Sequence, residues 1–187
     1  MSAFRTAALA TVLVAASVHA EDTFAIDPVH STALFRINHM GVSNFYGRFD
    51  DLSGTIAYNP ADIGKTSISY SIKADSVDTH FEKRDQHLKG PDFFDAKKFD
   101  SITFKSTAVK AVDDKTMEVT GNLTLHGVTK PLTVKVVHVG DGKGQAGEQR
   151  IGFETTFDIK RSDFGMTFMP DMLGDEVSII LSTEGKK

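Results

Sequence analysis

Several residue types are missing or scarce in this chain of 187 residues. Cysteine is absent, which excludes disulfide bonds, thiol catalysis, zinc–thiolate sites and a lipid-modified N-terminal cysteine. Tryptophan is absent too, and 14 phenylalanines supply most of the aromatic bulk without a polar group to satisfy. Basic residues do not outnumber acidic ones, since 21 Lys and Arg stand against 25 Asp and Glu, so the composition argues against a nucleic-acid partner.

The longest apolar run stands at the N-terminus. Residues 1–20 combine a positive charge at Arg5, an apolar stretch from Thr6 to Val18, and small residues at Val18 and Ala20. This pattern is typical of a secretory signal peptide and is too short for a membrane span; a buried N-terminal helix is the alternative. We therefore predict that 1–20 is cleaved and that the mature domain, 21–187, is exported and not membrane-spanning. The lack of disulfides favours a bacterial periplasm.

The dominant signal in the mature chain is alternation of apolar and polar residues, which is typical of half-buried strands. Eight segments show it: 33–39, 52–58, 68–74, 102–108, 117–125, 132–138, 151–159 and 177–181. Short connections between amphipathic strands favour an all-β fold, an eight-stranded antiparallel barrel that leaves no sheet edge exposed. A β-sandwich is the alternative, because alternation alone does not distinguish the two.

One segment breaks the alternation and predicts a short helical insert near one end of the barrel. Residues 79–82 fit a capping box, with the Thr79 hydroxyl and Glu82 satisfying free N–H groups, and Gly90–Pro91 would end the helix near Lys89. Residues 92–95 resemble a second, shorter helical start. A helix this short needs tertiary packing, so its apolar side should cover the open end of the sheet.

Several strings occur in an order that is more specific than any one of them alone. They are Ile26–Ser31, Asn38–Ser43, Gly47–Phe49, Arg84–Leu88, Asp92–Asp95, Gly121–Leu132 and Arg161–Met166. Together they resemble the YceI-like family of bacterial exported proteins, over most of the mature chain. The resemblance implies a lipocalin-like eight-stranded barrel, a polyisoprenoid or similar long-chain lipid in its lumen, a periplasmic location and no established catalytic activity.

Three polar residues are candidates for contact with a lipid head group. His39 shares a strand face with Phe35 and Ile37, so it should point inward near a strand end; a hydrogen-bonded structural histidine is the alternative. Arg84 and His87 share one face of the predicted helix. Arg84 can offer a planar fork to a phosphate or a carbonyl, or it can pair with Asp92, Asp95 or a neighbouring carboxylate.

Aromatic residues and methionines gather near loops and helix ends, where they can form a soft apolar gate or ordinary core. Together with the inward strand faces they complete the predicted ligand-binding set. It comprises Phe35, Ile37, His39, Phe45, Phe49, Phe81, Arg84, His87, Leu88, Phe93, Phe94, Phe164 and Met166. We predict no catalytic residues, no metal ligands and no cofactor.

Three functions compete at this point. The first is a non-enzymatic periplasmic carrier that holds a long-chain isoprenoid or fatty lipid in the barrel lumen. The second is a metal-dependent hydrolase or isomerase that uses His39, His87 and an aspartate, although no ligand spacing demands it. The third is an envelope interaction or stress module whose loop ends contact a partner. A homodimer is compatible with all three.

Overall fold

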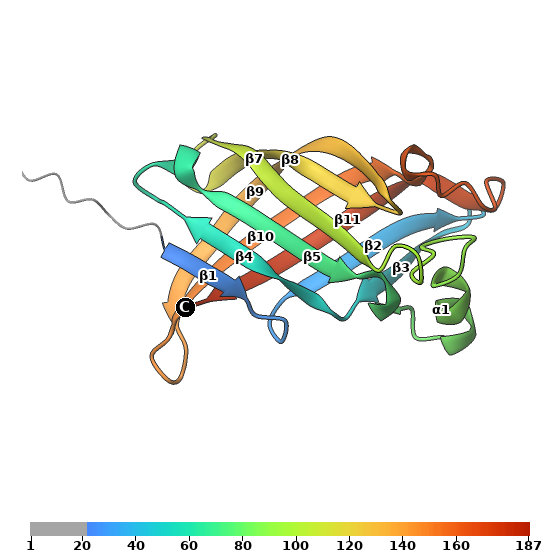
Figure 1. The fold of residues 1–187 in the computed structure, drawn as a ribbon, viewed down its shortest axis with the longest axis horizontal. Coiled ribbons are helices and arrows are strands. Elements are labelled where there is room, and N and C mark those ends of the chain that lie inside the picture. Colours follow the sequence, from blue (N-terminus) through green and yellow to red (C-terminus); the bar gives the residue numbers. More distant parts are fainter. Residues whose placement is uncertain (1–21) are drawn as a thin grey trace, which may run out of the picture.

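The computed structural model describes residues 22–187, so the predicted signal peptide at 1–20 lies outside the described residues. Most of the described chain is β-structure, with α1 (Glu82–Leu88) as its α-helix (Figure 1). The strands are β1 (Asp22–Ile26), β2 (Thr32–His39), β3 (Ser43–Phe49), β4 (Leu52–Tyr58), β5 (Ser67–Lys73), β6 (Val77–Asp78), β7 (Ser101–Ala111), β8 (Thr116–Leu125), β9 (Val128–Lys143), β10 (Gln149–Lys160) and β11 (Leu173–Lys186). Three 3-10 turns, Ile63–Lys65, Ala74–Ser76 and Arg161–Phe164, join some of them.

Eight strands close into an antiparallel barrel in the order β1-β4-β5-β7-β8-β9-β10-β11, and pairing of β1 with β11 completes the ring. The closing contact is short, with Ala25 opposite Lys186 and Ile26 opposite Gly185. The predicted fold class is therefore confirmed. No helix within residues 22–187 is long and apolar enough to cross a membrane.

A strand hairpin extends the wall beyond the closing contact. Most of β11 pairs with β2, from Leu173 opposite His39 to Ser182 opposite Thr32, and β2 in turn pairs with β3. All eight predicted segments form strands, but β1, β3 and the two-residue β6 were not predicted. The alternating pattern of β3 is interrupted at Gly47, which has no apolar side chain to mark the inward face. A Cβ at Gly47 would lie 2.2 Å from the ring of Phe35, so Phe35 already fills that space.

The helical insert lies at one end of the barrel, below β2 and β3 in Figure 1. The predicted capping box is wrong: α1 begins at Glu82 without a side-chain cap. Thr79 instead donates both its backbone N–H, at 2.9 Å, and its hydroxyl to the buried carboxylate of Asp85. The predicted second helix is also wrong, because 91–94 form turns, with the Phe94 N–H donating to the Leu88 carbonyl at 3.0 Å.

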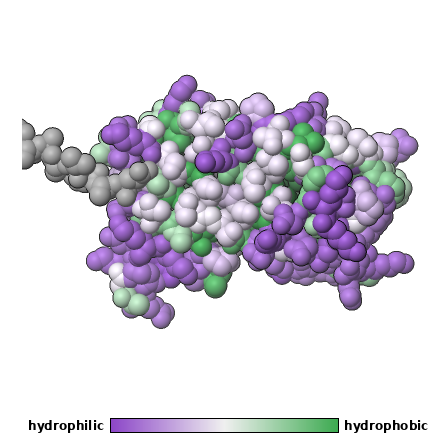
Figure 2. Space-filling model, in the orientation of Figure 1, coloured by the Kyte–Doolittle hydropathy of each residue, from purple (hydrophilic) through white to green (hydrophobic). Residues whose placement is uncertain are grey.

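The two ends of the barrel are packed differently. The end near β1 is filled by what we call the floor cluster, in which Val119 and Ile151 are 0% and 1% exposed. The floor cluster consists of Phe24, Ile56, Val109, Met117, Val119, Val134, Val136, Ile151 and Phe153. The outside is polar, and Figure 2 shows hydrophilic side chains gathered over both ends of one face. The barrel interior between the floor cluster and α1 is not part of this packed cluster.

Candidate ligand-binding site

A cavity of about 520 Å³ occupies the barrel lumen above the floor cluster. Its volume lies in the range of small-molecule binding sites. It is bounded by inward-facing side chains of most barrel strands and is almost wholly apolar. The wall includes Phe35, Ile37, Phe49, Ile72, Ile102, Phe104, Leu123, Leu132, Phe157, Ile159, Val177, Ile179 and Leu181.

The burial of these side chains follows the cavity. Ile56, Val119 and Phe153 border the cavity from below and are fully buried, so they form its closed bottom. Higher in the barrel, Phe104 and Ile179 also face inward, yet they are only half-buried because the space in front of them is empty. Apolar residues thus alternate along the whole barrel, but their side chains pack against one another only at the floor and line a cavity above it.

A single polar pair lies deep in the described lumen wall. The Thr183 hydroxyl donates to the Tyr70 hydroxyl oxygen at 3.4 Å, and both residues are buried. Burial raises the pKa of Tyr70, against a smaller opposing effect of the Thr183 hydrogen bond, so the phenol stays neutral at ordinary pH. A hydrocarbon chain in the lumen would therefore meet no charge at this depth.

Arg84 on α1 borders the upper end of the cavity, which we call the mouth. Its Nε donates to the Thr79 hydroxyl and its Nη2 to the Thr79 carbonyl, both at 2.7 Å. The guanidinium lies 4.3 Å from the ring centroid of Phe45. Within residues 22–187 Arg84 forms no ion pair with a carboxylate, so the alternative of a salt bridge to Asp92 or Asp95 is wrong. Thr79, held by Asp85, positions a cation at the mouth without neutralising it.

The two candidate histidines border the mouth and have different surroundings. His39 is exposed at the end of β2, next to the lumen wall. His87 pairs its Nε2 with Asp92 Oδ2 at 2.9 Å and packs edge-on against Phe93 and Phe168. His87 therefore anchors α1 to two neighbouring loops, and His39 is the freer of the two for contact with a ligand.

Eleven of the thirteen predicted residues border the cavity. They are Phe35, Ile37, His39, Phe45, Phe49, Arg84, His87, Leu88, Phe93, Phe94 and Met166. The other two lie elsewhere: Phe81 is 57% exposed beside α1, and Phe164 is buried against Leu123, Leu125 and Met166 outside the lumen.

Sequence reasoning missed much of the lumen wall. Phe104, Leu132, Val177 and Ile179 border the cavity although they were not singled out. Each stands on the apolar face of a predicted strand, so the alternation contained the signal. Choosing among inward positions requires knowledge of which level of the barrel is hollow, and alternation does not carry that information.

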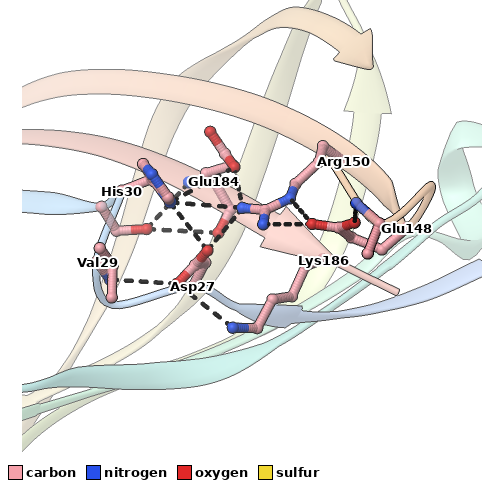
Figure 3. Close-up of polar contacts among 9 residues, drawn as sticks. Asp27, Val29, His30, Glu148, Arg150, Glu184 and Lys186 are labelled. Atoms are coloured by element: carbon pink, nitrogen blue, oxygen red, sulfur yellow. Dashed lines mark hydrogen bonds and ion pairs between the residues drawn. The ribbon is translucent and has the colours of Figure 1, made fainter. Parts of the chain in front are cut away.

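A polar cluster closes the opposite end of the barrel (Figure 3). Arg150 of β10 donates to Asp27 Oδ2 at 2.6 Å and to Glu148 Oε1 at 2.6 Å, and it also contacts Glu184 of β11. His30 Nδ1 lies 3.0 Å from the buried carboxylate of Asp27. We call the set Asp27, His30, Glu148, Arg150, Glu184 and Lys186 the Asp27 cluster.

The electrostatics of the Asp27 cluster favour ionised side chains. The hydrogen bond with His30 holds the pKa of Asp27 well below its usual range, against the opposing effect of burial, with help from the Val29 N–H, Arg150 and Lys186. The pKa of Arg150 is raised, chiefly by Glu148 and then by Glu184. The cluster ties the corner between β1 and β2 to β10 and β11, where the barrel closes.

The Asp27 cluster also contains three groups with metal-ligand chemistry. Ligand atoms of Asp27, His30 and Glu184 lie within 4.8 Å of one another. The Arg150 guanidinium already contacts both carboxylates, so a fixed cation balances their charge. His39 and His87 belong to the other end of the barrel, and the hypothetical metal site built on them does not form within 22–187.

Comparison with known proteins shows a match to the YceI-like domain over residues 24–185. A relative from Ectopseudomonas mendocina, called UPF0312 protein, is 37% identical over 179 residues, which cover 95% of this chain and 93% of the relative.

Two solved structures share the fold. BcnA from Burkholderia cenocepacia superposes with a TM-score of 0.78 at 25% identity, covering 85% of this chain and 98% of BcnA. A domain from Saccharophagus degradans, described as a polyisoprenoid binding domain implicated in plant cell wall breakdown, has a TM-score of 0.67 at 18% identity. That match covers 87% of this chain and 97% of the domain.

Proposed function

The chain belongs to the YceI-like family, and from this premise we propose that it is a periplasmic protein that binds and carries a long-chain isoprenoid or similar lipid. The observation that carries the proposal is the apolar lumen of about 520 Å³, closed below by the floor cluster and bordered above by α1. A structural neighbour described as a polyisoprenoid binding domain supports the same ligand class.

The energetics of such a complex are favourable. Each buried methylene contributes about 0.8 kcal/mol, so a chain of about twenty carbons offers roughly 16 kcal/mol before costs. Association costs about 4–15 kcal/mol. The lumen needs few polar contacts to retain such a chain, and its length and width would set which chains fit.

The head group would lie at the mouth, beside Arg84. Thr79 occupies its Nε and Nη2, whereas Nη1 makes no hydrogen bond within 22–187. A guanidinium on an aromatic face with a free donor suits a phosphate or carbonyl oxygen. His39, at the end of β2, also borders the cavity and offers a second polar contact. These residues are ligand-positioning groups, and we propose no catalytic step for them.

The proposed function includes export of the protein to the periplasm. Residues 1–20 would direct export and be removed, leaving a mature chain that begins at Glu21. The intact mass of the protein from the periplasmic fraction tests this, and we expect the mass of 21–187. A mass that includes residues 1–20, or recovery in the cytoplasmic fraction, would contradict export.

Lipid binding can be tested with two neighbouring positions on β11. Ile179 faces the lumen, whereas Ile180 does not border it. We expect native mass spectrometry of the purified protein, incubated with geranylgeraniol in detergent, to show a one-to-one complex. Ile179→Trp should fill the lumen and reduce occupancy at least tenfold, while the matched control Ile180→Trp should bind like the parent. A protein that never takes up a prenyl or fatty chain would refute the carrier function.

A further inference from the structure

The barrel wall is not hydrogen-bonded all the way around. β9 and β10 pair from Gln149 opposite Lys143 to Glu154 opposite Val137, with a register shift at Gly152/Phe153. Beyond that point, residues 155–160 of β10 pair with β11, and 128–136 of β9 pair with β8, but the described chain shows no ladder between them. A side-chain hydrogen bond spans the gap, from the Thr155 hydroxyl to the Lys135 carbonyl at 2.7 Å. We call this gap the seam.

The sequence along the β9 side of the seam resembles that of a protected edge strand. Pro131 has no N–H to offer a neighbour, and proline is confined to sheet edges or bulges. Lys130 and Lys135 flank it on the same strand. Proline and lysine are the residues by which natural sheets block pairing along an edge. The β9 side of the seam therefore has the residues of a strand edge that stays unpaired.

A surface groove of about 390 Å³ lies over the seam. Residues of both strands border it, including Lys130 and Pro131 from β9 and Asp158 from β10. The groove and the lumen are close neighbours, because the same three apolar side chains, Leu123, Leu132 and Ile159, border both spaces. Along the seam the barrel wall is therefore formed by side chains and not by backbone hydrogen bonds between β9 and β10.

The 3-10 turn after β10 closes the outer end of the seam. Phe164 borders the groove and is buried against Leu123 and Leu125. The Phe164 carbonyl accepts from His126 Nδ1 at 3.0 Å, in the connection between β8 and β9. On the surface, Lys130 Nζ and Asp163 Oδ1 form an exposed ion pair at 3.0 Å. Phe164 thus closes the outer end of the groove with a side chain and not with a strand ladder.

We propose that the seam is a lateral opening of the lumen, through which the hydrocarbon chain of the ligand passes sideways between β9 and β10, with Phe164 as its gate. This inference rests on the proposed lipid binding and adds the route to it. At the mouth, α1 and the 91–99 turns cover the lumen, so axial passage of a long chain requires their displacement. At the seam, passage requires the Phe164, Leu123, Leu132 and Ile159 side chains to move. It also breaks the hydrogen bond from Thr155 to Lys135 and the exposed ion pair between Lys130 and Asp163, but no strand ladder.

The test uses the absence of cysteine from the natural chain. Thr133→Cys with Asp158→Cys places two thiols at positions that would face each other if the Glu154–Val137 register continued. A short bis-maleimide then bridges the seam. The matched control, Val137→Cys with Glu154→Cys, bridges the paired part of the same two strands. Uptake of geranylgeraniol from detergent is followed over time by native mass spectrometry.

We expect the seam bridge to slow uptake at least tenfold relative to the same variant without reagent, with occupancy at equilibrium unchanged within twofold. The control bridge should leave the rate unchanged. Phe164→Ala should have the opposite effect and speed release at least threefold. An unchanged uptake rate in the bridged seam variant would overturn the lateral opening while leaving lipid binding intact. If the unbridged proteins take up no lipid, the proposed function fails and the lateral opening fails with it.

Discussion

The two ends of this barrel are built from the same strands, yet one end is filled by packed side chains and the other encloses a cavity. At the floor, inward side chains meet across the lumen, and the Asp27 cluster ties the chain where β1 meets β11. At the mouth, the inward side chains surround an empty space. The hairpin β2–β3 extends the wall there, and residues of α1 border the cavity. The difference shows that one alternating pattern can specify either a core or a binding site.

Packing explains how stability and function are separated in space. Close-packed interiors hold the fold together, and a cavity forfeits contacts at every residue that lines it. The floor cluster and the Asp27 cluster therefore supply the stability that the hollow half lacks. Substitutions at the floor should change folding, whereas substitutions at the mouth should change binding.

Two isoleucines at opposite ends give the largest expected contrast. Ile151→Ala at the 1% exposed floor position should lower the free energy of unfolding by about 3–4 kcal/mol, through lost burial and a new cavity. Ile37→Ala, at the half-buried cavity wall, should cost about 1 kcal/mol, because the methyl groups that it removes already face empty space. Urea denaturation of the ligand-free proteins measures both. Equal losses would show that the mouth half is as well packed as the floor.

Asp27→Asn should have the next largest effect, lowering the free energy of unfolding at neutral pH by about 2–3 kcal/mol, because Arg150 then loses a buried counter-charge. The pKa of Asp27 is lower in the folded state than the usual 3.8, so folding is favoured by its ionised form. The contribution of Asp27 to the free energy of unfolding is therefore present above about pH 4 and is lost as the pH falls further.

The pH dependence separates Asp27 from general acid unfolding. The parent protein should lose stability between about pH 4 and pH 2, and Asp27→Asn should lose less over the same interval. Asp114→Asn, at an exposed carboxylate without an ion pair within residues 22–187, serves as control and should follow the parent curve. Parallel curves for Asp27→Asn and the parent would mean that Asp27 does not carry this linkage.

Arg84→Gln should show the smallest effect on folding and a selective effect on binding. The side chain is half-buried and, within residues 22–187, forms hydrogen bonds only with Thr79, so we expect a loss of less than about 1 kcal/mol in stability. Affinity for a prenyl phosphate should fall about tenfold, while affinity for the corresponding uncharged prenyl alcohol should stay within threefold. An equal loss for both ligands would place the head group away from Arg84.

Much of the fold could be predicted because its information is local. Alternation located the eight predicted strands, and the family strings identified the barrel. The errors occurred where a specific side-chain contact in the folded chain overrides a local pattern. Gly47 hides the apolar face of β3 because Phe35, on another strand, provides the missing bulk. Thr79 fits a capping box by spacing, yet Asp85 captures both of its donors.

The candidate site was predicted less completely. His39, Arg84 and His87 border the mouth as expected, but Phe164 and Phe81 do not border the lumen. Phe164 illustrates the reason: its string marks it as notable, whereas its position beside an unpaired strand edge depends on where the ladder between β9 and β10 ends. Aromatic residues at strand ends are equally suited to a lumen, a gate and a surface.

The amino-acid order alone determined which side of each predicted strand is apolar, because side chains alternate with a period of two whatever the strand pairs with. It also excluded disulfides and favoured a barrel around an apolar interior. Only the tertiary structure decided that the floor is solid and the mouth hollow, that Arg84 has no carboxylate partner within residues 22–187, and that the ladder between β9 and β10 ends at Glu154. The volume of the lumen, for example, is set jointly by residues more than a hundred positions apart, such as Phe35 and Ile179, and no local pattern records such a sum.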